Sequence, residues 1–122
     1  MFAGNAEEAM NFYISLFPDS EIVSIKRYGA SGPGAEGTVM HASFSLSGQL
    51  FMCIDSAEHA FTFTPSMSLY IDCESDAEIE KLFKELSNGG SVLMPLVAYP
   101  FSKKYTWVSD KYGVSWQLNY NQ

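Results

Sequence analysis

Side chains suited to nucleophilic or redox chemistry are few in this chain of 122 residues, and they are widely spaced. Cys53 and Cys73 lie in apolar runs, with no second cysteine or histidine at metal-ligand spacing. They are typical of buried free thiols in a reducing compartment, rather than of a disulfide or redox pair. No G-x-S-x-G motif is present, and the glycines between positions 29 and 37 lack the phosphate-loop pattern. The sequence therefore identifies no catalytic residue.

The two histidines could act as bases or ligands, because imidazole titrates near neutral pH. His41 alternates with Ser43 and Ser45 on one side of an expected strand, a position that could face either a binding cleft or solvent. His59 follows Glu58 in an acidic linker, where solvent exposure is expected. For both histidines a purely structural role remains the alternative.

Aromatic residues recur towards the C-terminus, where two strand-like runs are joined by a polar connection at positions 109–113. Such rings favour flat or apolar ligands through stacking and area burial, although core packing or a subunit interface would use the same residues. We expect the rings to supply affinity and a few polar side chains to supply orientation. The predicted ligand-binding residues are Trp107, Trp116, Gln117, Tyr105, His41, Asp55 and Phe63.

The order of elements needed to position these residues repeats once along the chain. Apolar spacing predicts helices over residues 6–17 and 76–87, opened by capping boxes at Asn5 and Ser75. Strands are expected at 21–28, 39–46 and 49–55 in the first half, and at 66–73, 91–96 and in a hairpin over 105–118 in the second, with a loop at 97–104. The chain is thus predicted to be one domain of two βαβββ half-units, about 1–56 and 66–122. The first strand is cut short, so we expect the native chain to begin several residues earlier or Met1 to be an internal methionine.

Composition excludes several kinds of partner. The net charge is −7 and the basic residues are scattered, which disfavours nucleic acid and anionic membranes. No apolar run approaches the length of about twenty residues that spans a bilayer, and no signal-peptide pattern opens the chain, so a cytoplasmic location is expected. The hydrophobic content of 47% leaves apolar surface that a homodimer would cover.

Three segments resemble the PhnB-like branch of the vicinal oxygen chelate superfamily, which includes glyoxalase I, bleomycin and fosfomycin resistance proteins and extradiol dioxygenases. They are residues 2–13, 39–44 and 107–118, and the most specific element is the motif D-x-x-G-V-x-W from Asp110 to Trp116. The resemblance implies an α+β fold in which paired βαβββ units form two curved mixed sheets around a cleft, commonly in a dimer. Some related sequences are labelled 3-demethylubiquinone methyltransferase. No glycine-rich turn opens a helix after a first strand here, so a nucleotide-like cofactor is not expected.

The resemblance also implies four metal-ligand positions, which this chain fills poorly. The first falls before Met1, the second lies at Met52 and Cys53 near Asp55, and the third and fourth correspond to Ser66 and Gln117. One amide oxygen does not hold a divalent ion alone, so no cofactor is predicted.

The predicted function is therefore the binding of a small organic molecule in an aromatic cleft without a standard metal centre. The alternative is a metal-dependent lyase, isomerase or dioxygenase of the same superfamily. Its ligands would be Asp55, His41 or Gln117, together with one upstream of Met1. A third possibility is a partner-binding module whose interior is filled by side chains.

Overall fold

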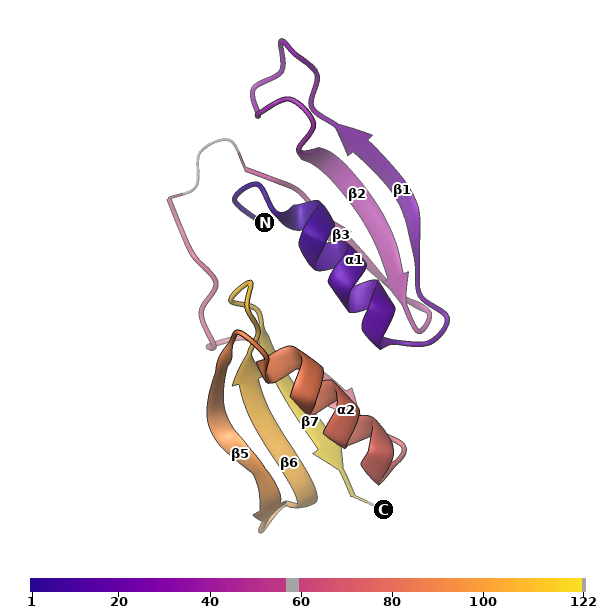
Figure 1. Ribbon diagram of the computed structural model, residues 1–122, viewed down its shortest axis with the longest axis vertical. Coiled ribbons are helices and arrows are strands. Elements are labelled where there is room, and N and C mark those ends of the chain that lie inside the picture. Colours follow the sequence, from indigo (N-terminus) through magenta and orange to yellow (C-terminus); the bar gives the residue numbers. More distant parts are fainter. Residues whose placement is uncertain (57–59, 122) are drawn as a thin grey trace. The chain divides into compact units, whose positions relative to one another are not determined.

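The computed structural model describes residues 1–56 and 60–121, and the chain divides into two compact units, Met1–Phe61 and Thr62–Gln122. In Figure 1 each unit has its own sheet, with one helix lying across a face of that sheet. Within the described residues, no helix combines the length and the apolar character needed to cross a membrane.

The first unit has helix α1 (Ala6–Leu16) on a sheet of the strands β1 (Glu21–Arg27), β2 (Val39–Leu46) and β3 (Gln49–Cys53). The strands are antiparallel in the order β1-β2-β3. Phe2 forms a single parallel bridge to Asp55, just beyond β3. The expected first strand is thus present only as this bridge.

The second unit consists of β4 (Leu69–Asp72), α2 (Asp76–Ser87), β5 (Ser91–Tyr99), β6 (Ser102–Ser109) and β7 (Ser115–Tyr120). Its strand order is β4-β7-β6-β5, and β4 runs parallel to β7. The first unit has the same order if the Phe2 bridge is counted as its first strand. The predicted α+β class, with two βαβββ-type units, is confirmed.

The loop predicted over residues 97–104 is wrong. Strand β5 continues to Tyr99 and β6 begins at Ser102, so that only Pro100 and Phe101 connect them. The proline in this sequence suggested an irregular stretch, but its fixed φ suits a turn position. Pro95 is accommodated because β5 is an edge strand, where a missing N–H need not break the sheet.

The two predicted helix caps have different outcomes. Ser75 Oγ accepts a hydrogen bond from Glu78 N at 3.0 Å, as expected for α2. Asn5, in contrast, makes no side-chain cap bond to α1. The carboxylate of Asp55 replaces it, since Oδ1 accepts from Ala6 N at 3.0 Å.

Burial shows which face of the four-stranded sheet α2 covers. The core is made by side chains with at most 1% exposure: Ile79, Leu82 and Leu86 from α2, and Thr106, Val108, Trp116 and Leu118 from β6 and β7. Lys104 Nζ also bonds Asp76 at 2.7 Å, and it bonds Glu80, both on α2. Side chains alternate across a strand, so the residues between these face away from α2. We refer to that side as the open face.

Candidate functional site

The open face carries a row of one amide flanked by two aromatic rings. Gln117 on β7 is the register partner of Tyr70 on β4 and of Trp107 on β6. Tyr70 is 52% exposed, whereas Gln117 and Trp107 are half-buried. We call these residues the middle row.

Hydroxyl groups lie on one side of the middle row. Trp107 Nε1 donates to Ser115 Oγ at 2.8 Å, and Ser115 Oγ shares a 2.7 Å hydrogen bond with Ser68 Oγ. Ser115 is buried, so water does not compete for these bonds. The indole plane is therefore held in one orientation by its neighbours.

Asp72, Asn119 and Tyr105 lie on the other side of the middle row. Asn119 is paired in register with both Asp72 and Tyr105, and its Nδ2 donates to Asp72 Oδ1 at 3.0 Å. Ser102 Oγ donates to Asn119 Oδ1. These bonds fix the carboxylate at the edge of the open face.

Tyr105, the register partner of Asn119, also bonds Gln117 of the middle row. Its hydroxyl donates to Gln117 Oε1 at 2.7 Å, and its ring stands edge-on to Phe101 and Tyr99, with centroids 4.9 and 5.6 Å away. Burial, and then the neighbouring Tyr70 and Tyr99, raise the pKa of the Tyr105 phenol. The hydroxyl consequently keeps its proton at neutral pH and acts as a donor.

Trp116 was expected on the same ligand surface as Trp107, but it lies on the opposite side of the sheet. Trp116 is paired with Val108 and has 0% exposure, and its Nε1 donates to Asp110 Oδ2 at 2.9 Å. Asp110 Oδ1 also accepts from Val114 N at 3.0 Å. This explains the spacing of D-x-x-G-V-x-W, because one carboxylate holds both the turn and the indole. Trp116 can therefore act on a site only by holding this hairpin.

The remaining predicted site residues are placed as follows. Phe63 is 38% exposed and packs at the β6–β7 turn, where its Cβ lies 3.4 Å from a Cβ built on Gly113. His41 is exposed on the face of β2 that points away from α1, and it shares this face with Ser43, which is buried, and with the half-buried Ser45. His59 lies outside the described residues.

Asp55 is only 3% exposed, and both of its carboxylate oxygens are engaged. Oδ1 accepts from Gly4 N and Ala6 N at 2.9 and 3.0 Å, and Oδ2 accepts from Val39 N at 2.8 Å. These contacts join the chain start, α1 and β2. The structure thus gives Asp55 a structural role within the first unit.

Sequence reasoning missed Tyr70, Ser68 and Asp72. These residues alternate with Leu69 and Ile71, which have the same register as the buried Trp116 and Leu118. The alternation along residues 66–73 is the signal that could have found them.

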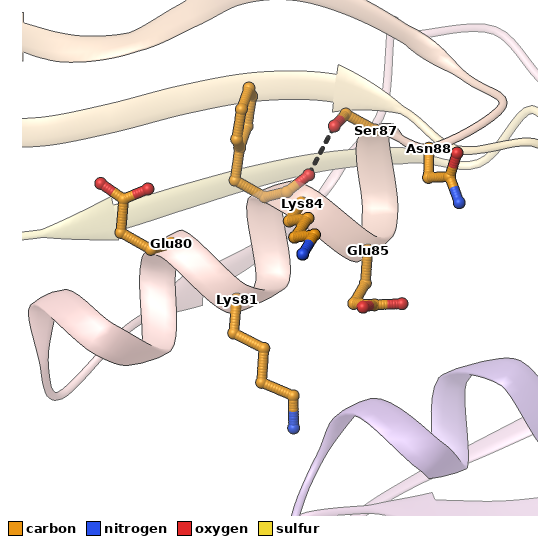
Figure 2. A pocket seen from close by; sticks show the side chains of 7 residues that line it. Glu80, Lys81, Lys84, Glu85, Ser87 and Asn88 are labelled. Atoms are coloured by element: carbon orange, nitrogen blue, oxygen red, sulfur yellow. Dashed lines mark hydrogen bonds between the residues drawn. The ribbon is translucent and has the colours of Figure 1, made fainter.

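A hollow lies on α2 in the second unit. Its lining includes the charged Glu80, Lys81, Lys84 and Glu85. Figure 2 shows Lys81 and Glu85 directed away from the strands, and Ser87 Oγ donating to Phe83 O. The lining comes from a single solvated helix face and has no convergent set of bonded groups, so we assign no function to it.

The family model described as 3-demethylubiquinone-9 3-methyltransferase matches residues 1–119. The chain belongs to this family. A solved structure described as a putative 3-demethylubiquinone-9 3-methyltransferase, PhnB protein, from Bacillus cereus is 64% identical, with 98% of this chain and 94% of that chain covered and a TM-score of 0.96.

Two further structures support the fold. Protein PA1353 from Pseudomonas aeruginosa is 29% identical, with coverages of 99% and 92% and a TM-score of 0.87. The fosfomycin resistance protein FosX from Listeria monocytogenes is 10% identical, with coverages of 100% and 88% and a TM-score of 0.64, and shows likeness of fold alone. The search of curated proteins found no match. The predicted PhnB-like resemblance is confirmed, and the likeness to FosX extends to the fold of the vicinal oxygen chelate superfamily that the sequence resembles.

The metal centre implied by this superfamily does not fit the side chains in the described residues. No group of three or more His, Cys, Asp or Glu side chains converges there. Of the positions carried over from the superfamily, Gln117 Oε1 accepts from Tyr105. Asp55, which follows the position at Met52 and Cys53 in the sequence, has its carboxylate oxygens bonded by backbone N–H groups. Cys53 is buried, and its thiol pKa is raised by burial and by Asp55, which disfavours the thiolate that binds metals.

Proposed function

We propose that this member of the family binds a small, flat organic molecule against the open face of its four-stranded sheet. The observation that carries the proposal is the middle row, in which the Gln117 amide lies between the rings of Tyr70 and Trp107. Membership of the PhnB-like branch is consistent with binding, and the proposal needs no methyl transfer.

The spacing of the strands supports a flat ligand. Neighbouring strands lie about 4.8 Å apart, so the Cα atoms of Tyr70 and Trp107 are separated by about 10 Å across β7. A ring stacked between two others needs roughly 7 Å between them, twice the usual contact distance of about 3.5 Å. Modest tilting of the two side chains therefore accommodates a planar molecule above Gln117.

The polar groups around the row supply orientation rather than catalysis. The hydroxyls of Ser115 and Ser68 hold the indole of Trp107, and the hydroxyl of Tyr105 holds the amide of Gln117. Side chains fixed in this way lose little entropy when a ligand binds. We propose that binding requires no metal ion, since the donor groups carried over from the superfamily are already bonded within the protein.

We also propose that the protein is a cytoplasmic homodimer. The first unit supports a subunit interface, because Met52 and Leu50 are 65% and 51% exposed on the side of β3 that faces away from α1. Apolar residues exposed side by side are commonly covered by a partner. Sedimentation equilibrium should therefore show a mass of about twice 13.5 kDa.

The binding proposal is tested with 1-indanone, a flat bicyclic ketone, as the probe. Its dissociation constant is measured by NMR titration for the unaltered protein and for Trp107→Leu. Loss of stacking should weaken binding roughly three- to tenfold.

Tyr120→Leu is the matched control. It removes a half-buried ring from β7, on the side of the sheet that faces α2. Its dissociation constant should stay within a factor of two of the unaltered protein. Failure of 1-indanone to bind, or equal losses in both variants, would contradict the assignment of the open face.

A further inference from the structure

The hydrogen bond between Tyr105 and Gln117 determines which end of the amide is available to a ligand. A primary amide has one accepting oxygen and one nitrogen with two N–H donors. The oxygen of Gln117 is used by the Tyr105 hydroxyl at 2.7 Å. The nitrogen therefore points away from Tyr105, and within the described ranges no acceptor is bonded to it.

Tyr105 is fixed firmly enough to impose this orientation. It is only 5% exposed, and its ring packs against Phe101 and Tyr99. If the amide turned over, its N–H would donate to the Tyr105 oxygen, and the phenolic proton would lose Gln117 Oε1 as its acceptor. Because Tyr105 is buried, leaving this donor without an acceptor costs about 1–3 kcal/mol.

The other polar atoms of the middle row do not oppose this preference. Trp107 Nε1 is occupied by Ser115 Oγ, so the indole offers a ligand its ring face but not its N–H. The Tyr70 hydroxyl both donates and accepts, and thus does not discriminate. In the middle row, Gln117 is the group for which a protein neighbour decides whether a donor or an acceptor is left for the ligand.

We propose that Tyr105 is a specificity-determining residue that acts through Gln117, so that the open face takes flat ligands with a hydrogen-bond acceptor, such as a carbonyl oxygen, and disfavours those with only a donor. This inference rests on the proposed function and names its ligand class. A ring carbonyl directed at Gln117 Nε2 would complete the amide's hydrogen bonds. A ring N–H in the same place would meet N–H and leave both groups unpaired.

The test compares two flat bicyclic probes of similar size, 1-indanone, which only accepts, and indole, whose ring N–H only donates. Dissociation constants for both are measured by NMR titration in the unaltered protein and in variants. The ratio of the two constants reports polarity, and its change between variants cancels the differing hydrophobicity of the probes. In the unaltered protein we expect 1-indanone to bind about fivefold tighter than indole.

Tyr105→Phe should reduce this ratio to near one, because the amide is then free to turn. The Gln117 side-chain NH₂ resonances should shift in the same variant. Tyr99→Phe is the matched control, since it removes a hydroxyl that donates to Pro95 O within the same ring cluster. It should leave the ratio unchanged.

Gln117→Glu provides an independent arm if Tyr105→Phe is poorly folded. A carboxylate only accepts hydrogen bonds, so this variant should bind indole tighter than 1-indanone. An unchanged ratio in both Tyr105→Phe and Gln117→Glu, with both probes still sensitive to Trp107→Leu, overturns the inference and leaves the proposed function standing. Absence of binding by both probes overturns the inference and the proposed function together.

Discussion

Replacement of Asp55 should destabilise the first unit more than the loss of any exposed carboxylate. Its two oxygens accept hydrogen bonds from the backbone N–H groups of Gly4, Ala6 and Val39 at 2.9, 3.0 and 2.8 Å. The Asp55→Ala variant would leave these donors without their acceptor. Gly4 is exposed, so water can replace that bond, but Ala6 and Val39 are both 0% exposed.

The magnitude follows from the two buried donors. A buried group left unsatisfied costs about 1–3 kcal/mol, so two of them together cost about 2–6 kcal/mol. We expect Asp55→Ala to lower the free energy of unfolding by about 4 kcal/mol, a large part of the roughly 5–15 kcal/mol typical of a domain. Asp55→Asn keeps one accepting oxygen and should lose about half as much.

Urea denaturation followed by circular dichroism measures this difference. Asp72→Asn is the control, because Asp72 is an exposed carboxylate with one hydrogen bond to Asn119. It should cost less than about 0.5 kcal/mol. A loss below about 1 kcal/mol for Asp55→Ala would refute the structural role, especially if the variant also failed to bind 1-indanone.

Three further predictions concern a close contact, the thiols and metals. Gly90→Ala should destabilise the protein by about 3 kcal/mol, because its Cβ would lie 2.0 Å from Ser109 O, whereas Gly29→Ala has open space and should be nearly neutral; thermal unfolding compares them. Burial raises the pKa of the Cys73 thiol from 9.0 to about 12. The protonated thiol therefore contributes fully to stability below pH 9, and this contribution falls as the pH rises from 9 to 12. Urea unfolding should show a lower free energy of unfolding at pH 10 than at pH 7, and Cys73→Ala should reduce that difference. Elemental analysis should find less than about 0.1 equivalent of Ni, Zn, Mn or Fe, and chelator treatment should leave 1-indanone binding unchanged; stoichiometric metal would support the metal-dependent alternative.

Patterns within one element predicted the fold well. The apolar stripe of α2 and the alternation of β2 depend on periodicities that sequence displays directly, and the bounds of both elements agree with the structure. The α1 cap was missed because its acceptor is Asp55, which lies 49 positions from Ala6. A distant side chain of this kind leaves no local signal.

The site was predicted only in part, because strand register decides which side a residue faces. Tyr105, Trp107 and Gln117 were expected near a ligand and do lie together on the open face. Trp116 was grouped with them, but the connection between β6 and β7 pairs it with Val108 and turns it towards α2. A one-residue difference in register moves a side chain to the other face of the sheet, and aromatic composition alone does not reveal it.

The two indole N–H signals of the NMR spectrum test the central claim most directly. The chain has two tryptophans, one on the open face and one in the core against α2, and Trp107→Leu assigns their signals. Titration with 1-indanone should shift the Trp107 signal and leave that of Trp116 in place. A shift confined to Trp116, or a saturating shift of other residues with the Trp107 signal unmoved, would contradict binding at the open face.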